Sequence, residues 1–377
     1  MDSYVVRRCE PSEIRESIEQ LWERNLPIEQ SAVDKFSWLY EQAPLVPRDV
    51  FVIAAAAQGG EPERPVGTAG VGLRDIYVGG GSGARAEILR AGLLADLAVD
   101  REHRTVAPAL RLVREVRAWA LSELDLAYGF PNQHAQGVFR RVGYSALGAM
   151  SRYVRVLRYG SYLSRASAED LKRLPAWARP LAQQVLSRPG RSQRLAATAY
   201  ELAQLARDAR GLLVARRHEP LTLGQRVPAG VDALFHRCRT EYDLVAVRSD
   251  RLLRWRYPAA PGRLWAAVRS GSRLDAYAMI DRIGDAMHLR DVFGTRAGVA
   301  ALLSQLVFEC YRLGASSVSM RFLGESWMTE LLASLRFEKR AADRSIYLGI
   351  SPRVVGALRE RLSEPACWFL TDFDEDV

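Results

Sequence analysis

Cysteine is scarce and widely spaced in this chain of 377 residues. The cysteines form no CxxC pair and no other spacing typical of metal ligands: Cys9, Cys238, Cys310 and Cys367. Zinc sites and disulfide frameworks need clustered or regularly spaced cysteines, so the sequence predicts neither a metal centre nor a disulfide scaffold. Isolated cysteines are also typical of proteins from a reducing compartment.

Long apolar runs are missing as well. No run reaches the roughly 18 residues that a membrane-spanning helix needs. Met1 leads almost directly into the strand-like residues 4–8, without a signal-peptide pattern. Together with the cysteine usage, this favours a cytoplasmic protein.

Two common catalytic motifs are absent. The glycine-rich residues 79–83 are not followed by the Lys-Ser or Lys-Thr pair of a phosphate-binding P-loop, so we interpret them as a flexible turn. No serine stands in a nucleophile-elbow sequence, which disfavours covalent hydrolase chemistry.

Positive charge is in excess, at a formal net charge of +9, and the excess is local. Residues 161–218 hold eleven Arg or Lys against four Asp or Glu, a net charge of +7. Such a stretch can meet phosphate, anionic lipid or an acidic substrate, or it can be a solvated arginine-rich helical surface.

Length and pattern predict two compact units, because a usual domain has about 100 to 200 residues. Strand-like and helix-like segments alternate in residues 1–158 and again in residues 219–349. Prolines break residues 159–218 into short helices, which we interpret as a basic helical linker. Residues 350–377 form a tail, and we expect its acidic end, from Trp368 onward, to pack loosely or fray.

The two units contain related segments. FSWLYEQAP and LRWRYPAAP share a Trp, a Tyr and a final Ala-Pro at identical offsets, so that Trp38 matches Trp255 and Tyr40 matches Tyr257. An internal repeat is the simplest explanation. We expect these rings on one face of a strand or on adjacent faces of a turn, where both core packing and stacking on a sugar or nucleobase are open.

Residues 93–144 hold the most informative order of elements. They predict an apolar strand, a loop carrying Arg104, a helix from about Ala107 to Leu121, a second strand and a short helix. The same order returns over residues 287–337. Asp96 lies inside the first strand, where an acidic side chain needs a partner or a cleft.

The run Arg104-Thr105-Val106-Ala107-Pro108-Ala109 resembles the Arg/Gln-x-x-Gly-x-Gly/Ala loop of the GNAT superfamily of acyl-CoA-dependent N-acyltransferases. In that family, the loop and the start of the following helix hold the cofactor pyrophosphate, and helix N-termini in general attract anions. The resemblance implies acetyl-CoA or another acyl-CoA as co-substrate at these residues, with Leu97 and Val99 of the preceding strand beside it. Pro108 suits a first helical turn, whereas Ala107 departs from the family's glycine.

A second motif follows. Asn132-Gln133-His134-Ala135, Phe139 and Gly143-Tyr144 resemble the family's Asn-x-x-Ala, aromatic and Gly-Phe/Tyr signature. The resemblance places Asn132 near the pantetheine arm and gives position 139 to a tyrosine that protonates the departing thiolate. Phe139 cannot donate a proton, so Tyr128, Tyr144 or water would take that role. Core packing is the alternative for Phe139 and Tyr144, and a helix N-cap is the alternative for Asn132.

An amine acceptor must lose a proton before it attacks a thioester, which calls for a base. Asp96 is the first candidate, because it lies mid-strand opposite the expected thioester position, and an ion pair with a nearby arginine is the alternative. His103 and His134 lie near the same loops, where lone histidines more often have surface or capping roles. The backbone amides of residues 94–97 are candidates to polarise the thioester carbonyl.

In the second unit, the equivalent loop at residues 294–300 keeps Arg296 and Gly298 but does not align with the family pattern. We therefore expect an α/β protein of two GNAT-like mixed β-sheet domains, flanked by helices and joined by a helical linker. The active site would lie in the first half, and the second half would shape the substrate cleft. The implied function is transfer of an acyl group from acyl-CoA to a small-molecule or cell-envelope precursor amine, without a metal and without DNA.

Two alternatives stay open. Fem-type ligases of cell-wall synthesis also resemble tandem GNAT domains and take aminoacyl groups from tRNA, which the basic residues 165–217 would suit. A GNAT-fold protein in which both sites have decayed would bind without catalysis, and Ala107, Phe139 and the altered second loop support that interpretation.

Overall fold

The computed structural model of the protein describes residues 4–26, 31–45, 50–55, 65–79, 87–158 and 219–375. The helical linker expected over residues 159–218 lies outside these residues. Within the described ranges, no helix is long and apolar enough to cross a membrane.

The first half alternates strands and helices in the predicted order. Its strands are β1 (Tyr4–Cys9), β2 (Val50–Ala55), β3 (Pro65–Val78), β4 (Glu87–Val99), β5 (Leu126–Gly129) and β6 (Ser145–Val156). Its helices are η1 (Pro11–Ile14), α1 (Arg15–Asn25), α2 (Ala32–Phe36), η2 (Ser37–Glu41), η3 (Arg101–His103), α3 (Val106–Glu123) and α4 (Gln136–Val142). The central strand β4 begins six residues earlier than the apolar pattern indicated. Most of its first four residues are exposed, so an apolar pattern does not mark them.

The second half repeats much of this order. Its strands are β7 (Thr222–Gly224), β8 (Leu244–Ala246), β9 (Arg263–Ser270), β10 (Arg273–Ile283), β11 (Ala286–Gly294), β12 (Ser317–Gly324), β13 (Glu338–Ile350) and β14 (Trp368–Leu370). Its helices are α9 (Val231–Cys238), η5 (Arg239–Glu241), α10 (Asp250–Arg256), α11 (Arg296–Arg312), α12 (Ser326–Ser334), α13 (Gly356–Ser363), η6 (Pro365–Cys367) and η7 (Asp372–Asp374).

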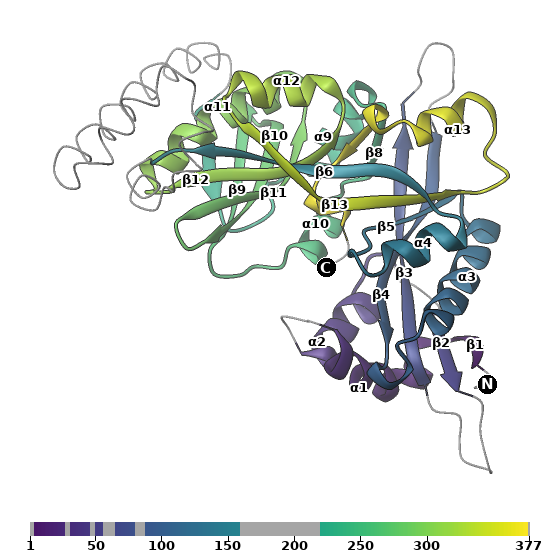
Figure 1. Cartoon of the computed structure of the whole chain (residues 1–377). Helices are drawn as coiled ribbons and strands as arrows, with labels where there is room; N and C mark the ends of the chain where they lie inside the picture. Colours follow the sequence, from purple (N-terminus) through teal and green to yellow (C-terminus); the bar gives the residue numbers. More distant parts are fainter. Residues whose placement is uncertain are drawn as a thin grey trace, which may run out of the picture.

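The strands join one large mixed sheet, whereas the sequence predicted two sheets (Figure 1). Its main path runs β1-β2-β3-β4-β5-β13-β6-β12-β11-β10-β9-β7. The halves exchange their long final strands: β6 pairs antiparallel with β12, and β13 pairs antiparallel with β5. Each exchanged strand covers a sheet edge that the other half would otherwise expose. The prediction of two separate sheets is therefore wrong, because the strands of both halves form one sheet.

Helices cover the sheet on both sides. The α3 residues Leu112, Val113 and Val116 recur at helical spacing and are buried in one core cluster, on the sheet face that also presents Leu94. Helices α1 and α2 pack on the other side, where their apolar residues join a core that continues through the second half. Burial of these apolar stripes is what holds the helices to the sheet.

The C-terminal segment is not loose. Trp368, Phe369 and Phe373 are each at most 1% exposed, and β14 pairs with both β12 and β8. Gly324 of β12 lies so close to this segment that a Cβ there would fall 1.6 Å from the carbonyl oxygen of Trp368. The expectation that the acidic end frays is wrong, because apolar residues between its carboxylates pack into the core.

The two Trp-x-Tyr segments are helical, contrary to the expected strand or turn. Trp38 and Tyr40 lie in η2, while Trp255 lies near the end of α10 and Tyr257 follows it directly. All four side chains belong to or pack against the core, which agrees with the packing interpretation.

Candidate functional site

The two parallel strands at the centre of the first half separate part of the way along. Their last ladder pair is Leu94 with Gly129. Beyond it, β4 continues to Val99 while β5 ends, so this stretch of β4 has no neighbour on the β5 side within the described residues. An opening between diverging parallel strands is a usual position for a ligand in an α/β sheet.

A β-bulge marks the same stretch of β4. The pairing with β3 passes from Thr68–Ala98 to Gly70–Ala95, so that both Asp96 and Leu97 lie opposite one residue of β3. Asp96 has a φ of 56°, in the left-handed region that aspartate adopts more readily than most residues. Bulges interrupt the ladder and re-aim backbone groups, and they are frequent beside functional sites.

A buried ion pair holds the bulge. The Asp96 carboxylate lies 2.9 Å from the Lys35 ammonium of α2, and the two side chains are 6% and 5% exposed. Burial raises the pKa of Asp96, and Lys35 opposes that rise. The second carboxylate oxygen of Asp96 is buried without a hydrogen-bond partner among the described residues. The ion pair expected as the alternative for Asp96 therefore exists, with a lysine in place of an arginine.

Side chains of α1 and β3 form a chain of hydrogen bonds that ends at the bulge. The Trp22 indole N–H donates to the Thr68 hydroxyl at 3.2 Å, and Thr68 in turn donates to the backbone carbonyl of Asp96 at 3.5 Å. Tyr40 packs against Gly70, where a Cβ would lie 2.6 Å from the tyrosine oxygen. The strained backbone of Asp96 is thus fixed through both its side chain and its carbonyl.

The loop after β4 leads into a helix start without a side-chain cap. Thr105 is the N-cap residue of α3, yet its side chain accepts no hydrogen bond from the first turn, and Ala107 is exposed. Arg104 turns away toward the strand and α1, donating to the carbonyls of Val99 at 3.1 Å and Asn25 at 3.3 Å. Backbone N–H groups at the start of α3 are therefore left for an outside acceptor.

The matching helix start in the second half is closed by its own residues. The Thr295 hydroxyl accepts from the Gly298 N–H at 3.0 Å, and the Glu241 carboxylate accepts from the Arg296 N–H at 2.8 Å. A carboxylate thus already occupies the place where the α3 start offers free donors.

The strand opening of the second half is filled as well. The parallel pairing of β11 with β12 ends at Leu289–Met320, and β14 then pairs with β12 at Leu323–Leu370. The C-terminal segment therefore pairs with β12, the counterpart of β5, just beyond the point where β11 and β12 separate.

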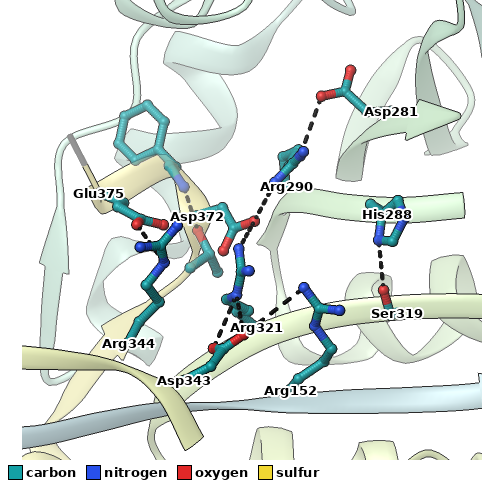
Figure 2. A network of polar contacts seen from close by, with 12 residues as sticks. Arg152, Asp281, His288, Arg290, Ser319, Arg321, Asp343, Arg344, Asp372 and Glu375 are labelled. Atoms are coloured by element: carbon teal, nitrogen blue, oxygen red, sulfur yellow. Dashed lines mark hydrogen bonds and ion pairs between the residues drawn. The ribbon is translucent and has the colours of Figure 1, made fainter. Parts of the chain in front are cut away.

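Carboxylates neutralise the arginines next to this filled opening (Figure 2). Asp372 of the C-terminal segment bridges Arg290 at 2.9 Å and Arg321 at 3.4 Å. Glu375 pairs with Arg344 at 2.8 Å. The pKa of the nearby His288 is lowered by burial and by surrounding arginines, and its Nδ1 lies 2.8 Å from the Ser319 hydroxyl oxygen. This network is a closed set of ion pairs around the tail.

The aromatic candidates lie in the core. Tyr128 and Tyr144 are 2% and 3% exposed, their hydroxyls have no hydrogen-bond partner among the described residues, and burial raises the pKa of both. The Phe139 ring lies 5.0 Å from that of Tyr144 and 5.9 Å from that of Tyr347. The packing alternative describes Phe139 and Tyr144, which lie in one core cluster, and Tyr128 is buried in the other cluster.

The remaining candidates have local partners or lie on the surface. The Asn132 side chain accepts from the N–H groups of His134 at 3.1 Å and Ala135 at 3.0 Å. These bonds cap the turn before α4, whereas the N-cap residue of α4 itself is Ala135, without a side-chain cap. His103 lies 3.0 Å from the Tyr4 hydroxyl, and His134 is exposed. Of the candidates, Asp96 and Leu97 lie at the bulge of β4, and residues 104–109 form the loop that follows this strand and the start of α3.

Sequence reasoning missed Lys35. A signal was present, because Lys35 stands four residues before Leu39 on the helical face that also includes Phe36, and a lysine within an apolar stripe calls for a buried carboxylate. The sequence predicts a strand or turn for the adjoining segment at residues 36–44, and in those conformations a spacing of four residues does not place two side chains on one face.

Comparison with known proteins supports the fold. No family model and no curated protein matches the chain. Among solved structures, a probable N-acyltransferase from Enterococcus faecalis is similar with a TM-score of 0.59 and 12% identity, covering 92% of this chain and 73% of that one. A GCN5-related N-acetyltransferase from Anabaena variabilis gives 0.56 and 11%, with the same coverage. A third, from Kribbella flavida, gives 0.50 and 13%, covering 93% and 71%. The chain shares the fold of the GCN5-related N-acetyltransferases.

Proposed function

We propose that the protein is an N-acyltransferase that moves an acyl group, acetyl in the simplest case, from acyl-CoA to an amine by direct attack in a ternary complex. One observation carries the proposal. The first half keeps both an open stretch of β4 and an uncapped start of α3, whereas in the second half the chain's own residues close both counterparts.

The first half has backbone N–H donors where the pyrophosphate of acyl-CoA would bind. The first turn of α3 offers the backbone N–H groups of Val106 and Ala107 and the positive end of the helix dipole to a pyrophosphate, and the exposed Ala107 leaves that approach clear. Pro108 has no N–H, and the Thr105 N–H already donates to the His103 carbonyl. Leu97 and Val99 lie on the stretch of β4 that has no β5 partner. Bound acyl-CoA would supply the thioester carbonyl, and the protein would supply its binding and orientation.

The bulge at Asp96 would contribute to the reaction by holding backbone amides in position beside the thioester oxygen. Backbone amides of residues 94–97 are fixed there by the Lys35–Asp96 pair, and fixed amides stabilise the negative charge that develops on a thioester oxygen during attack. In this scheme Asp96 is a positioning residue, because its carboxylate is engaged and enclosed. Water in the opening would accept the proton that the amine loses and would protonate the departing thiolate, since Tyr128 and Tyr144 are both buried.

Acetyl-CoA titrated into the full-length protein tests the proposal. A ligand at a hundred times its dissociation constant raises the free energy of unfolding by about 2.7 kcal/mol, which a thermal unfolding experiment resolves. Transfer of a labelled acetyl group to a panel of small amines and cell-envelope precursor amines then measures activity. Absence of any thermal shift with short- and long-chain acyl-CoA would refute the cofactor assignment.

A second candidate is a GNAT-fold protein that binds without catalysis. The burial of Tyr128 and Tyr144 and the pairing of Asp96 with Lys35 favour it, since none of these three candidate groups is then free to act as acid or base. It predicts acyl-CoA binding without transfer to any amine. The tRNA-dependent alternative depends on residues 165–217, which lie outside the described residues, and salt-sensitive tRNA binding without acyl-CoA binding would favour it.

A further inference from the structure

A cavity of about 110 Å³ lies where the first half meets the last elements of the second. Its polar lining comes from α3, from the turn after α4 and the start of β6, and from β13 and α13: Arg117, Gly143, Ser145, Gly349, Arg359 and Ser363. Because one water takes about 30 Å³ of liquid, the cavity has room for a small polyatomic group.

The lining carries positive charge and no negative charge. Arg117 and Arg359 are its charged residues, and no carboxylate lines the cavity among the described residues. Arg117 lies over the Tyr144 ring at 5.7 Å, and its Nε is buried without a hydrogen-bond partner. Arg359 donates from one nitrogen to the carbonyls of Ser351 and Val354, both at 3.3 Å.

Neither arginine forms an ion pair with any residue that the structure describes, although most arginines near the C-terminal segment do. A guanidinium whose Nε is removed from water and left unpaired is unfavourable, and an anion would offset that cost. The contrast with the closed network of Figure 2 is direct: there each arginine meets a carboxylate, and here none does.

Neutral donors complete the lining. Ser145 begins β6 and is exposed, so its hydroxyl is free to turn toward a ligand in the cavity. The ladder between β13 and β6 ends at Leu348–Ser145, and Gly349 therefore extends past it without a partner on β6. Hydroxyl and guanidinium donors together suit a tetrahedral oxyanion, and the planar guanidinium can hold two of its oxygens at once.

We propose that this cavity binds a phosphate-type oxyanion, held by Arg117 and Arg359 with the Ser145 hydroxyl as a further donor. Two unpaired positive charges match a dianionic phosphate better than a single carboxylate. The site is independent of the acyl-CoA site, because it lies against Arg117, more than two helical turns beyond the start of α3. A bound anion would join α3 to α13 and so tie the first half to the end of the chain.

Inorganic phosphate is the probe, titrated into the full-length protein by calorimetry and by thermal unfolding. Sodium chloride at matched ionic strength is the control, because salt alone screens exposed charge. We expect phosphate to raise the melting temperature above that in chloride, and acetate to bind more weakly than phosphate. Arg117→Gln should weaken phosphate binding at least tenfold. Arg114→Gln removes the same charge from an exposed position on the same helix and should leave phosphate affinity unchanged.

Ser145→Asp tests the site independently of any loss of folding. It places a carboxylate in the cavity that both arginines line, so the unliganded variant should melt higher than the native protein and should lose the phosphate-induced shift. A phosphate response that Arg114→Gln reduces as much as Arg117→Gln does would overturn the proposal in favour of a diffuse surface field. Phosphate stabilisation no larger than that of chloride, or equal binding of acetate, would also overturn it. The Thr105→Asp variant described below should bind phosphate normally, which separates this site from the acyl-CoA site.

Discussion

Trp38 and Trp255, which are 217 residues apart in the chain, stack with ring centroids 4.4 Å apart and planes 5° from parallel. Each indole N–H donates to the backbone carbonyl of the other tryptophan, at 2.9 Å and 2.7 Å. The two segments that match in sequence therefore contact each other through their matching residues. The reciprocal hydrogen bonds fix the relative position of the two halves at this point.

Replacing either tryptophan by alanine should lower the free energy of unfolding by about 3 kcal/mol, because stacked area and one hydrogen bond are lost and the other indole loses its ring partner. The effects of Trp38→Ala and Trp255→Ala should not add, with a coupling of roughly 0.5–3 kcal/mol. Chemical denaturation of both single variants and the double variant measures this. Trp119→Ala, which removes a tryptophan that packs on Phe51, should combine additively with Trp38→Ala; additivity within the Trp38–Trp255 pair would contradict the expectation.

Lys35→Met should destabilise the protein by about 3 kcal/mol at neutral pH, because it leaves the buried Asp96 carboxylate without a counter-ion. Loss of Lys35 raises the pKa of Asp96 further. A carboxyl group with a raised pKa in the folded state favours folding in its protonated form, and that contribution disappears as pH rises through the folded pKa. The deficit of the variant should therefore shrink as pH falls.

The double variant Lys35→Met/Asp96→Asn is the control, and it should recover part of the stability lost by Lys35→Met alone. Urea denaturation between pH 4 and pH 8 measures all three proteins. A Lys35→Met deficit that is constant with pH, or that grows on acidification, would exclude a charged Asp96 in this pair.

Thr105→Asp should weaken acetyl-CoA binding by about tenfold relative to Thr105→Asn, a difference of roughly 1.4 kcal/mol. Both side chains can cap α3, so both should keep or raise thermal stability, but only the aspartate places a negative charge where the pyrophosphate would bind. Calorimetry with acetyl-CoA compares these near-isosteric variants. Equal affinities would remove the α3 start from the cofactor site even if the protein binds acetyl-CoA elsewhere.

Asp374 should make stability depend on pH. Burial raises its pKa from 3.8 to about 6, with repulsion from Asp291 adding to the rise and Arg248 opposing it. Its protonated form favours folding, so its contribution is complete below pH 4 and is lost as pH rises through about 6. The stability of the native protein relative to Asp374→Asn, which does not titrate, should fall between pH 4 and pH 6 and level off above. A relative stability that rises over this window would show that the pair with Arg248 outweighs burial.

Local elements were predictable because their signals are local. The sequence predicted a helix from about Ala107 to Leu121, and the observed bounds of α3, Val106–Glu123, lie within two residues of those expected. The apolar run around Leu93 predicted the central strand β4 in the same way. The prediction of a strand or turn for the Trp-x-Tyr segments was wrong, because both segments are helical, and the contact between Trp38 and Trp255 joins residues far apart in the chain.

The candidate site was predictable only in outline. The motif run at 104–109 pointed to the start of α3, and the structure shows that this start has no side-chain cap. The state of Asp96 depended on Lys35, which lies 61 positions earlier and reaches it only after α2 has packed on the sheet. A side chain's partner across the fold is set by packing, so no spacing within residues 93–99 could reveal it.

By itself, the sequence determined the order of strands and helices, the phosphate-loop resemblance of the first half and the matching aromatic segments, because periodicity and motif spacing are properties of neighbouring residues. The tertiary structure alone decided the exchange of β6 and β13, the burial of the acidic C-terminal segment in the second half's opening and the Lys35–Asp96 pair. Each of these depends on which edges, faces and charges remain unpaired once the local elements have formed. That balance of burial and pairing exists only between segments far apart in the chain.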